Sequence, residues 1–314
     1  AALAGGADRA EHDRRDRNLQ VGAGVDDDGV VAAQFQQRTA HAARAALADE
    51  AALFRAAQAR GLVTIVDACH ALGSRRAGDG QPTGDCRYAE MATFSFHPVK
   101  AITTAEGGMV TTRDADKVAR LRRLRSHGIE RDSGRWSESA QGFDSGGEAN
   151  PWYHEMEELG FNYRLPDVLA ALGESQLAQL PGFMQRRRML AALYDRLLAP
   201  LAPAVRPVRT GAGTPNLHLY AVLIDFERIG RTRADLMRTL AARGIGTQVH
   251  YIPVNRQPYY RRRYGQISLP GADAYYRRVL SLPYFVGMTE SDVDRVVAEI
   301  QEWMTSRGER RTKP

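Results

Sequence analysis

The sequence is poor in cysteine and lysine and has no long apolar run. Its two cysteines, Cys69 and Cys86, stand in a chain of 314 residues. They form neither a metal-binding spacing nor a disulfide framework, which fits the reducing cytoplasm. No apolar run approaches the length of a membrane span, and the first residues contain no apolar region typical of a signal peptide. We therefore expect a cytoplasmic protein without a membrane segment or a metal site.

Positive charge comes almost entirely from arginine. The net charge is +6 and the isoelectric point is near 9.5, and much of the excess lies in residues 186–188, 261–263 and 307–313. A nucleic-acid-binding protein would interleave such runs with stacking aromatics or carry a recognised module, and we find neither pattern. We expect no nucleic-acid partner. A phosphorylated cofactor and an anionic substrate could use part of this charge.

Residues 1–58 are the least informative part of the chain. Within residues 1–38, an aspartate run at 26–28 and a single aromatic, Phe35, do not build a core. From Thr39 to Gly61 the sequence becomes rich in alanine, which predicts a helix with Thr39 as a possible N-cap and Gly61 as its end. We treat 1–58 as an atypical segment, partly disordered or helical.

Three short apolar, β-rich runs follow before residue 113. They cover 62–66, 91–96 and 109–112, and they predict strands buried in a mixed α/β sheet. Ligands gather at the carboxyl ends of strands in open α/β sheets. Asp67 directly follows the first run and Ser95 lies at the end of the second. Asp67 could instead be an ordinary helix cap or turn residue.

Lys100 is the only lysine between residues 1 and 116. A lone lysine among arginines indicates a need for an amine that can lose its proton, which arginine cannot do. Such an amine can form a Schiff base with a carbonyl group. The alternative is a solvated lysine in a turn. Glycines at 107 and 108 follow closely, and glycine permits a close approach of backbone segments.

The stretch S-F-H-P-V-K, residues 95–100, followed by A-E-G-G, residues 105–108, resembles the cofactor-lysine motif of the DegT/DnrJ/EryC1/StrS nucleotide-sugar aminotransferases. These are pyridoxal-phosphate enzymes of fold type I. The D-A-C-H-A stretch, residues 67–71, is similar to a second motif of the family, and G-F-N-Y-R-L, residues 160–165, to a third.

The resemblance implies a role for each matching residue. Lys100 would hold the cofactor and move protons. Asp67 would keep the ring nitrogen protonated, which makes the ring an electron sink, and His70 would bond the ring's phenolic oxygen. Ser95 and Asn162 would hold the phosphate. The family's asparagine reaches the cofactor of the neighbouring subunit, so the resemblance also implies a homodimer with a shared active site.

Within the family, the Q-V-H-Y-I-P stretch, residues 248–253, resembles the branch that acts in pseudaminic acid biosynthesis. That branch aminates C4 of a UDP-linked 4-keto-6-deoxy-N-acetylhexosamine with glutamate as amino donor. The substrate-binding residues expected by this resemblance are His250, Tyr251 and Arg164. Asn255 departs from the branch, which often has a histidine there. The lysine at position 100 argues against the family's sugar 3-dehydratases, which have a histidine in its place.

The expected fold is therefore that of a fold type I aminotransferase, with an incomplete large α/β domain, residues 59–182, and an α+β small domain, residues 183–314. The predicted elements after residue 113 are helices at 114–126, 167–180, 183–198, 232–243, 272–280 and 290–307, with strands at 217–224 and 245–249; residues 130–152 are expected to be a long polar loop. The family's phosphate-binding loop and ring-stacking aromatic should precede Asp67, and we find neither in 1–58. The alternative function is a truncated, weak or inactive pseudoenzyme of the same family.

Overall fold

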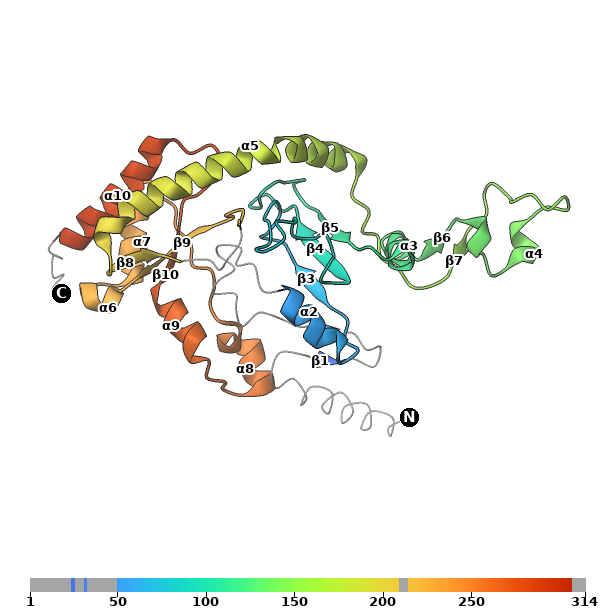
Figure 1. Ribbon diagram of the computed structural model, residues 1–314, viewed down its shortest axis with the longest axis horizontal. Coiled ribbons are helices and arrows are strands. Elements are labelled where there is room, and N and C mark those ends of the chain that lie inside the picture. The colour runs from blue at the N-terminus through green and yellow to red at the C-terminus, as the bar shows by residue number, and fades with distance from the viewer. Residues whose placement is uncertain (1–23, 26–30, 33–49, 209–213, 307–314) are drawn as a thin grey trace.

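The computed structural model describes residues 24–25, 31–32, 50–208 and 214–306. Figure 1 shows the two three-stranded sheets joined by one long helix, with a small module at the end opposite the C-terminus. The expected helix start at Thr39 lies outside the described residues. So does most of 1–58, the segment in which the phosphate-binding loop and the ring-stacking aromatic were sought. The described part of the predicted helix begins at residue 50. Two-residue strands β1 (Gly24–Val25) and β2 (Val31–Ala32) pair antiparallel.

The central sheet consists of β3 (Ile65–Asp67), β4 (Met91–Ser95) and β5 (Gly108–Thr111), in that order. β3 runs parallel to β4, and β5 runs antiparallel to it. Three strands lie where they were predicted before residue 113, although the first begins at residue 65; the predicted burial is wrong for β5, which is mostly exposed, and β3 is only partly buried. The close approach expected of the glycine pair is also present, because a Cβ on Gly108 would lie 2.7 Å from the carbonyl oxygen of Phe94.

Alternate side chains of β4 point into a small apolar core. Ala92 and Phe94 are buried there, as the period of two in a strand requires. They pack in one cluster with Ala68, Phe96, Ile102 and Leu180. β5, at one edge of the sheet, is largely exposed, and the side chains of Met109 and Val110 on it are uncovered. This edge is therefore an apolar surface.

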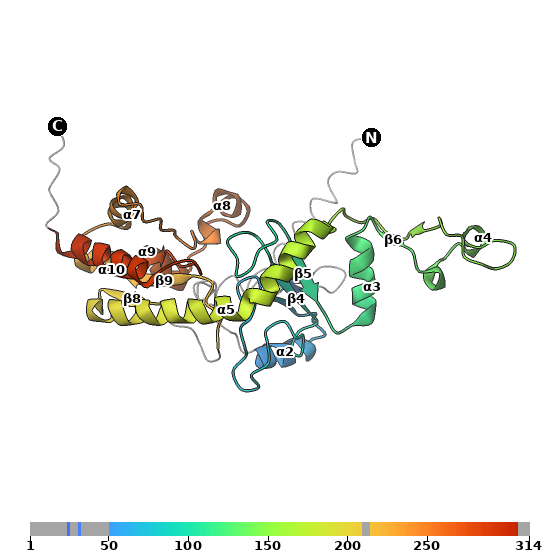
Figure 2. The same cartoon turned by 90° about the horizontal axis from the view of Figure 1, so that it is seen from above.

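One helix, α5 (Asp167–Leu198), connects the central sheet to the C-terminal part. The prediction of two helices around Pro181 is wrong. Proline lacks an N–H and so removes one helical hydrogen bond, but packing on either side of Pro181 maintains the helix. Leu180 belongs to the central core, whereas Leu190 and Tyr194 belong to the C-terminal core. Figure 2 shows that α5 bends along its length, as expected for a helix containing proline.

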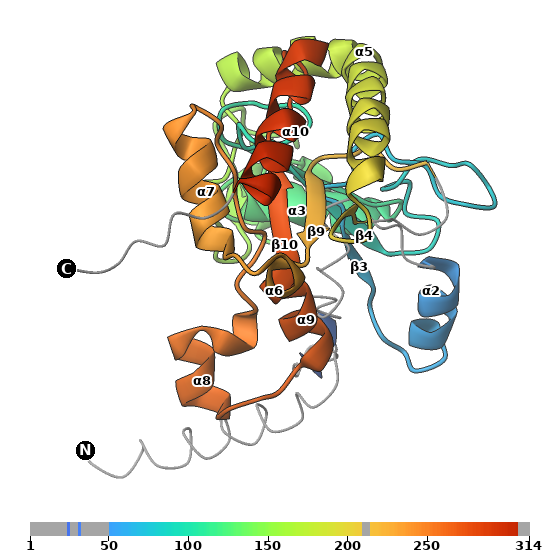
Figure 3. The ribbon, with the colours of Figure 1, turned by 90° about the vertical axis from the view of Figure 1, so that its left-hand side faces the viewer.

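The C-terminal sheet has the order β10 (Val279–Leu282), β9 (Tyr220–Ile224) and β8 (Val205–Pro207), and all pairs are antiparallel. The second half of α5, α7 (Arg233–Ala242) and α10 (Glu290–Thr305) pack against it, and Figure 3 shows α10 between the other two. This core contains fully buried side chains including Leu236 and Ile300.

Two predicted helices are confirmed here together with their caps. Thr232 caps α7 by accepting from the N–H of Asp235. Thr289 and Asp292 form a reciprocal capping box at the start of α10.

The remaining short elements were predicted less well. The strand expected at 245–249 is only a bridge between Gln248 and Ser281. β8 and β10 were not predicted, because β8 lies in a proline-rich stretch and β10 directly follows a helix, α9 (Pro270–Arg278). The other short elements are α6 (Phe226–Ile229), α8 (Pro258–Tyr264), η3 (Ala199–Leu201) and η4 (Val254–Arg256).

Residues 129–156, here called the distal module, follow α3 (Ala115–Leu124), the helix predicted at 114–126. They form β6 (Ile129–Glu130), η2 (Ser133–Arg135), α4 (Ser139–Gly142) and β7 (Glu155–Met156), where a loop was expected. The ring of Trp136 packs against Phe143 and Tyr153, with centroid distances of 5.4 and 4.8 Å. This aromatic cluster gives the polar, glycine-rich stretch a core. Figure 1 shows the module projecting from the central sheet.

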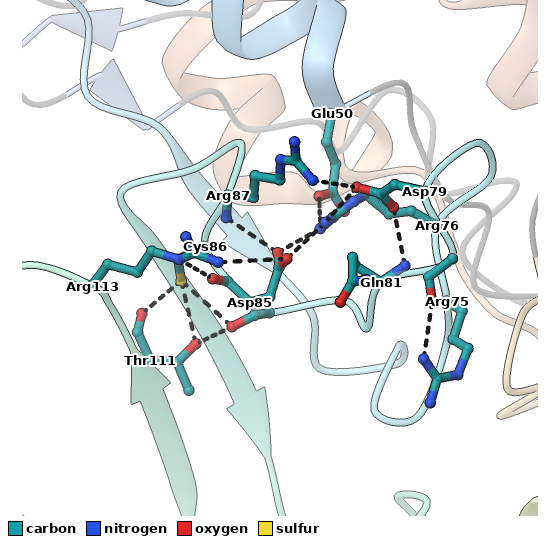
Figure 4. A network of polar contacts seen from close by, with 12 residues as sticks. Glu50, Arg75, Arg76, Asp79, Gln81, Asp85, Cys86, Arg87, Thr111 and Arg113 are labelled. Carbon is teal, nitrogen blue, oxygen red and sulfur yellow. Dashed lines mark hydrogen bonds and ion pairs between the residues drawn. The ribbon is translucent and has the colours of Figure 1, made fainter.

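The helix α2 (Glu50–Gln58) is attached to the central sheet by an ion-pair network around Arg76 (Figure 4). The Arg76 side chain is almost fully buried and contacts three carboxylates, those of Glu50, Asp79 and Asp85. The guanidinium also packs over the ring of Tyr88, whose centroid lies 5.1 Å from the guanidinium carbon.

Among the described helices, none combines the length and apolar character needed to cross a membrane.

Candidate active site

Polar side chains meet at the carboxyl ends of β3 and β4. Asp67 is the last residue of β3 and Ser95 the last of β4. Because the two strands are parallel, with Asp67 opposite Thr93, these ends lie at the same edge of the sheet. Asp67 also accepts a hydrogen bond from the N–H of Cys69, at 3.0 Å. It is thus a turn residue as well as a candidate ligand.

Lys100 is at this edge, in the turn that follows β4. Its N–H donates to the carbonyl of His97 at 2.8 Å. Its amine is half-buried, and burial lowers the pKa of Lys100 below its usual value, while the nearby groups of Cys69 and Asp67 act in the opposite direction. Lys100 therefore lies close to Asp67, as predicted from the motifs, and a larger fraction of its amine is unprotonated than in a solvated lysine.

The turn carrying Lys100 is fixed by hydrogen bonds on its C-terminal side. The hydroxyl of Thr103 and the N–H of Thr104 both donate to the carbonyl of Phe96, at 3.1 and 2.9 Å. Helix α5 packs against this turn through Gly173, where an added Cβ would lie 2.7 Å from the methyl of Thr104. The amine is therefore held on a rigid support.

His70, the third residue after Asp67, has a histidine partner that the sequence analysis missed. The ring centroid of His218 lies 4.4 Å from that of His70, with an angle of 49° between the rings. His218 is only 4% exposed. Its burial, and then the positive charges that His70 and Lys100 can carry, lower the pKa of His218 to about 2. His218 is therefore neutral at physiological pH.

The segment 214–218, which precedes β9, brings His218 to this site. The N–H of Asn216 donates to the hydroxyl of Ser74 at 2.8 Å, and its side-chain amide donates to the carbonyl of Leu72 at 2.7 Å. Thr214 pairs with Arg75 through two backbone hydrogen bonds. A polar residue beside a buried strand was the one signal in the sequence that could have identified His218.

His250, also from the C-terminal part of the chain, lies near Lys100. Its Nδ1 lies 2.8 Å from the hydroxyl of Ser281 on β10, and it is half-buried. Burial, followed by the charge of Lys100, lowers the pKa of His250. Tyr251 is exposed, and its ring packs against that of His250 with a centroid distance of 4.6 Å. Two histidines from the C-terminal part thus lie close to Lys100.

The other predicted site residues are placed differently. The hydroxyl of Ser95 accepts a long hydrogen bond, 3.5 Å, from the N–H of His97. Asn162 and Arg164 are exposed and follow the distal module; the segment 161–163 is bonded to residues 124–127 at the end of α3. Within the described chain no hydrogen bond joins Asn162 to Lys100, and Asn162 instead forms a β-bridge with Ser126. Asn255 donates to the carbonyl of Ile267 through its side-chain amide.

The donor set at this edge fits pyridoxal phosphate. The cofactor requires an amine for its aldehyde carbon, a carboxylate for its ring nitrogen and hydrogen-bonding groups around the ring. Lys100, Asp67 and His70 are of the residue types that would supply these groups. Two buried polar atoms beside them, Nδ1 of His218 and the side-chain oxygen of Asn216, have no hydrogen-bond partner among the described residues. Buried polar atoms are normally paired, so a ligand or water belongs next to them.

Comparison with known proteins agrees with this chemistry. The sequence profile of the DegT/DnrJ/EryC1/StrS aminotransferase family matches residues 44–301. The chain belongs to this family. The family and its neighbours of known structure are pyridoxal-phosphate-dependent sugar aminotransferases of fold type I. The predicted family, fold class and family cofactor are confirmed.

Individual relatives resemble the chain over most of its length. An uncharacterized protein of Methanocaldococcus jannaschii, MJ1066, is 34% identical over 244 residues, which cover 77% of this chain and 60% of the relative. Helicobacter pylori PseC, an aminotransferase involved in the biosynthesis of pseudoaminic acid, superposes with a TM-score of 0.70 and 27% identity. The match covers 82% of this chain and 63% of PseC.

The aminotransferase DesI, whose structure was determined in the presence of its TDP-sugar product, superposes with a TM-score of 0.67 and 30% identity. The match covers 83% of this chain and 60% of DesI. The chain thus spans about three-fifths of the length of the relatives it matches.

Proposed function

We propose that the chain acts as a pyridoxal-phosphate-dependent transaminase that moves an amino group from glutamate to C4 of a UDP-linked 4-keto-6-deoxy-N-acetylhexosamine. The observation that carries this proposal is the position of a half-buried Lys100 beside Asp67 at the carboxyl ends of β3 and β4. PseC and DesI support a nucleotide-sugar substrate, and the likeness to PseC favours the pseudaminic acid pathway. Both cysteines are free thiols, which suits the cytoplasm as the place of this reaction.

Each residue has a defined task in this proposal. Pyridoxal phosphate supplies an electron sink for the carbon that carries the transferred amino group. The Nζ of Lys100 accepts the proton from that carbon of glutamate, and later returns a proton to C4 of the sugar. Asp67 holds the proton on the ring nitrogen, and His70 orients the ring oxygen.

The remaining tasks concern the phosphate and the sugar nucleotide. Ser95 and Asn162 are the proposed phosphate donors. His250, Tyr251 and Arg164 are the proposed substrate contacts. His250 and Tyr251 belong to the C-terminal part of the chain, and His250 lies near Lys100. Arg164 lies on the segment after the distal module.

We also propose a homodimer in which Asn162 reaches the site of the partner. The support is a series of exposed apolar side chains that begins at the end of the distal module and continues onto α5. Its members are large and mostly more than half exposed: Trp152, Met156, Leu159, Phe161, Tyr163, Val168, Leu172 and Leu177. Exposed apolar surface of this extent is typical of a protein interface. Sedimentation velocity of the chain checks it, with Leu159→Asp and Val168→Asp expected to give monomers.

The cofactor-binding part and the small domain are proposed as residues 59–182 and 183–314. Two separate core clusters support this division. Helix α5 crosses the boundary, so the two parts are joined by a continuous helix.

The decisive experiment is chemical trapping. The chain contains three lysines, Lys100, Lys117 and Lys313. After addition of pyridoxal phosphate and borohydride, peptide mapping should show the reduced adduct on Lys100. Lys117 is an internal control, because its hydrogen bonds to Asp114 and Glu90 raise its pKa and keep the amine protonated. Pyridoxal phosphate bound to Lys100 as a Schiff base should give an absorbance band in the visible-violet region. Lys100→Arg should abolish this band, since guanidinium stays protonated. An adduct on Lys117 or Lys313 with Lys100 unmodified would refute the assignment.

Substrate class is tested separately with the same preparation. Glutamate-dependent release of 2-oxoglutarate is measured with the UDP-linked 4-keto-sugar and with a TDP-linked 4-keto-sugar as the matched control. Faster release with the UDP-sugar supports the proposal, and faster release with the TDP-sugar contradicts the proposed nucleotide. Trapping on Lys100 without release in either assay favours the alternative, a weak or inactive member of the family.

A further inference from the structure

We propose that His218 is a positioning residue, whose buried ring packs against His70 and fixes the orientation of the His70 ring at the cofactor site. The inference rests on the proposed function, because it concerns the same site. It adds a residue from beyond the central sheet to the machinery that surrounds Lys100. Three independent sets of contacts support it.

The first is the ring contact itself. Centroids 4.4 Å apart place the two imidazoles in van der Waals contact, and their angle of 49° is a tilted packing. The two rings are unequal: His218 is almost fully buried, whereas His70 is only partly buried. The buried ring of His218 is therefore held by its surroundings, and the more accessible ring of His70 is the one that it supports.

The second is the anchoring of the segment that carries His218. Asn216 bonds Leu72 and Ser74, which are two and four residues beyond His70 in the chain. The same segment is thus fixed to the turn that carries His70. On its other side, the guanidinium of Arg187 on α5 donates to the carbonyl of His218 at 3.1 Å. Both backbone and ring of His218 are consequently held in register with His70.

The third is charge. His70, Lys100, Arg187 and His250 all face His218 and disfavour its protonation, in addition to its burial. A neutral ring can pack closely on His70 without repelling a positive charge on His70 or Lys100. A positively charged side chain at position 218 would be disfavoured by the same groups. The site thus receives its second imidazole in a form suited to packing.

The contact can be measured without any cofactor. The chain is labelled with ¹³C at the Cε1 of histidine, and the His70 signal is assigned by its loss in His70→Gln. In the parent, the ring current of His218 should displace this signal from the position of free histidine. We expect His218→Ala to abolish the displacement and His218→Phe to retain most of it, because phenylalanine restores an aromatic ring.

Two variants separate positioning from general stability. Leu236→Ala, in the C-terminal core, should lower the melting temperature but leave the His70 signal unchanged. Because His218→Ala could fail to fold, the reciprocal change is made at the partly exposed partner: His70→Ala should shift the His218 signal. A His70 signal that is the same in the parent and in folded His218→Ala, or a His218 signal that His70→Ala leaves in place, overturns the proposal.

Activity gives a second readout. Turnover in the glutamate assay should fall by roughly ten- to a hundredfold in His218→Ala, as for a misplaced catalytic group, and recover substantially in His218→Phe. If the parent fails the Lys100 trapping test while the signals respond as expected, the proposed function falls and the ring-positioning role stands. If trapping succeeds while His218→Ala leaves the His70 signal unaffected, the proposed function stands and the ring-positioning role falls.

Discussion

The guanidinium of Arg76 donates to both carboxylate oxygens of Asp85, with nitrogen–oxygen distances of 2.6 and 2.8 Å. This bidentate pair is almost inaccessible to solvent, and each of its two residues contacts another part of the fold (Figure 4). Glu50 at the start of α2 contacts the same guanidinium at 3.2 Å. The backbone carbonyl of Asp85 accepts from Arg113, which follows β5. Arg76 therefore joins α2 to the edge of the central sheet.

Replacing Arg76 should destabilise the chain strongly. Arg76→Ala leaves the buried carboxylate of Glu50 without its cation and that of Asp85 with only the longer contact to the exposed Arg113, at 3.8 Å. Breaking a buried pair in this way costs roughly 3–5 kcal/mol. Urea unfolding measures the change. Arg87→Ala is the matched control, because its half-exposed side chain forms one ion pair among the described residues, with Asp79, and otherwise packs over the ring of Tyr88. We expect a change within about 0.5 kcal/mol. Equal effects of the two substitutions would show that the network is not a structural centre.

Glu155 holds the distal module together through its carboxylate. It accepts from the N–H of Ser137 at 2.6 Å, the N–H of Glu138 at 2.8 Å and the hydroxyl of Tyr153 at 3.1 Å. Burial alone would raise the pKa of Glu155, but these hydrogen bonds from backbone N–H groups outweigh it and lower the pKa to about 2. The ordinary value is 4.5.

This shift predicts a pH dependence that is local to the module. Because the folded-state pKa is below the unfolded value, the stabilisation is complete above about pH 4.5 and is lost as the pH falls through about 2. The amide signals of Ser137 and Glu138 should titrate with a midpoint near pH 2. At neutral pH, Glu155→Gln should reduce the hydrogen-exchange protection of these amides roughly tenfold or more, since it removes charge-assisted bonds.

Glu157→Gln provides the control for this prediction. Glu157 is exposed; its carboxyl accepts from the hydroxyl of Ser137 at 3.4 Å and is hydrogen-bonded with that of Glu155, a contact that a glutamine amide can keep. Its substitution should leave the protection of both amides essentially unchanged. Unchanged protection in Glu155→Gln as well would mean that the aromatic cluster around Trp136 suffices to hold the module.

Local patterns explain why part of this structure could be predicted from the sequence. The strands β3 to β5 are short apolar runs, and α7 and α10 have threonine caps at their first turns. Asp67 and Lys100 lie together because both follow neighbouring strands closely. In each case the information lies within a few residues of the element, so periodicity and capping residues identify it.

The missed features depend on contacts between distant parts of the chain. His218 reaches His70 only because Asn216 bonds the turn after β3, and no local pattern encodes that pairing. β10 is a strand because it pairs with β9, although it directly follows α9. Helix α5 continues through Pro181 because both of its halves are packed. Tertiary packing overrides local propensity at these positions.

Asp67 provides the clearest test of how the site works. Asp67→Asn keeps the size of the side chain and an oxygen that can accept from the N–H of Cys69, so the turn after β3 should persist. The neutral amide cannot hold a proton on the ring nitrogen of the cofactor. Pyridoxal phosphate should therefore still be trapped on Lys100, while turnover falls by about a hundredfold or more, the usual loss for a group that stabilises developing charge.

Asp116→Asn, an exposed position in α3, is the matched control and should retain the parent's turnover. The measurement is 2-oxoglutarate release alongside peptide mapping of the reduced adduct. Parent-like turnover in Asp67→Asn would reduce Asp67 to a turn residue, and loss of trapping together with turnover would show that the substitution disturbs the site as a whole.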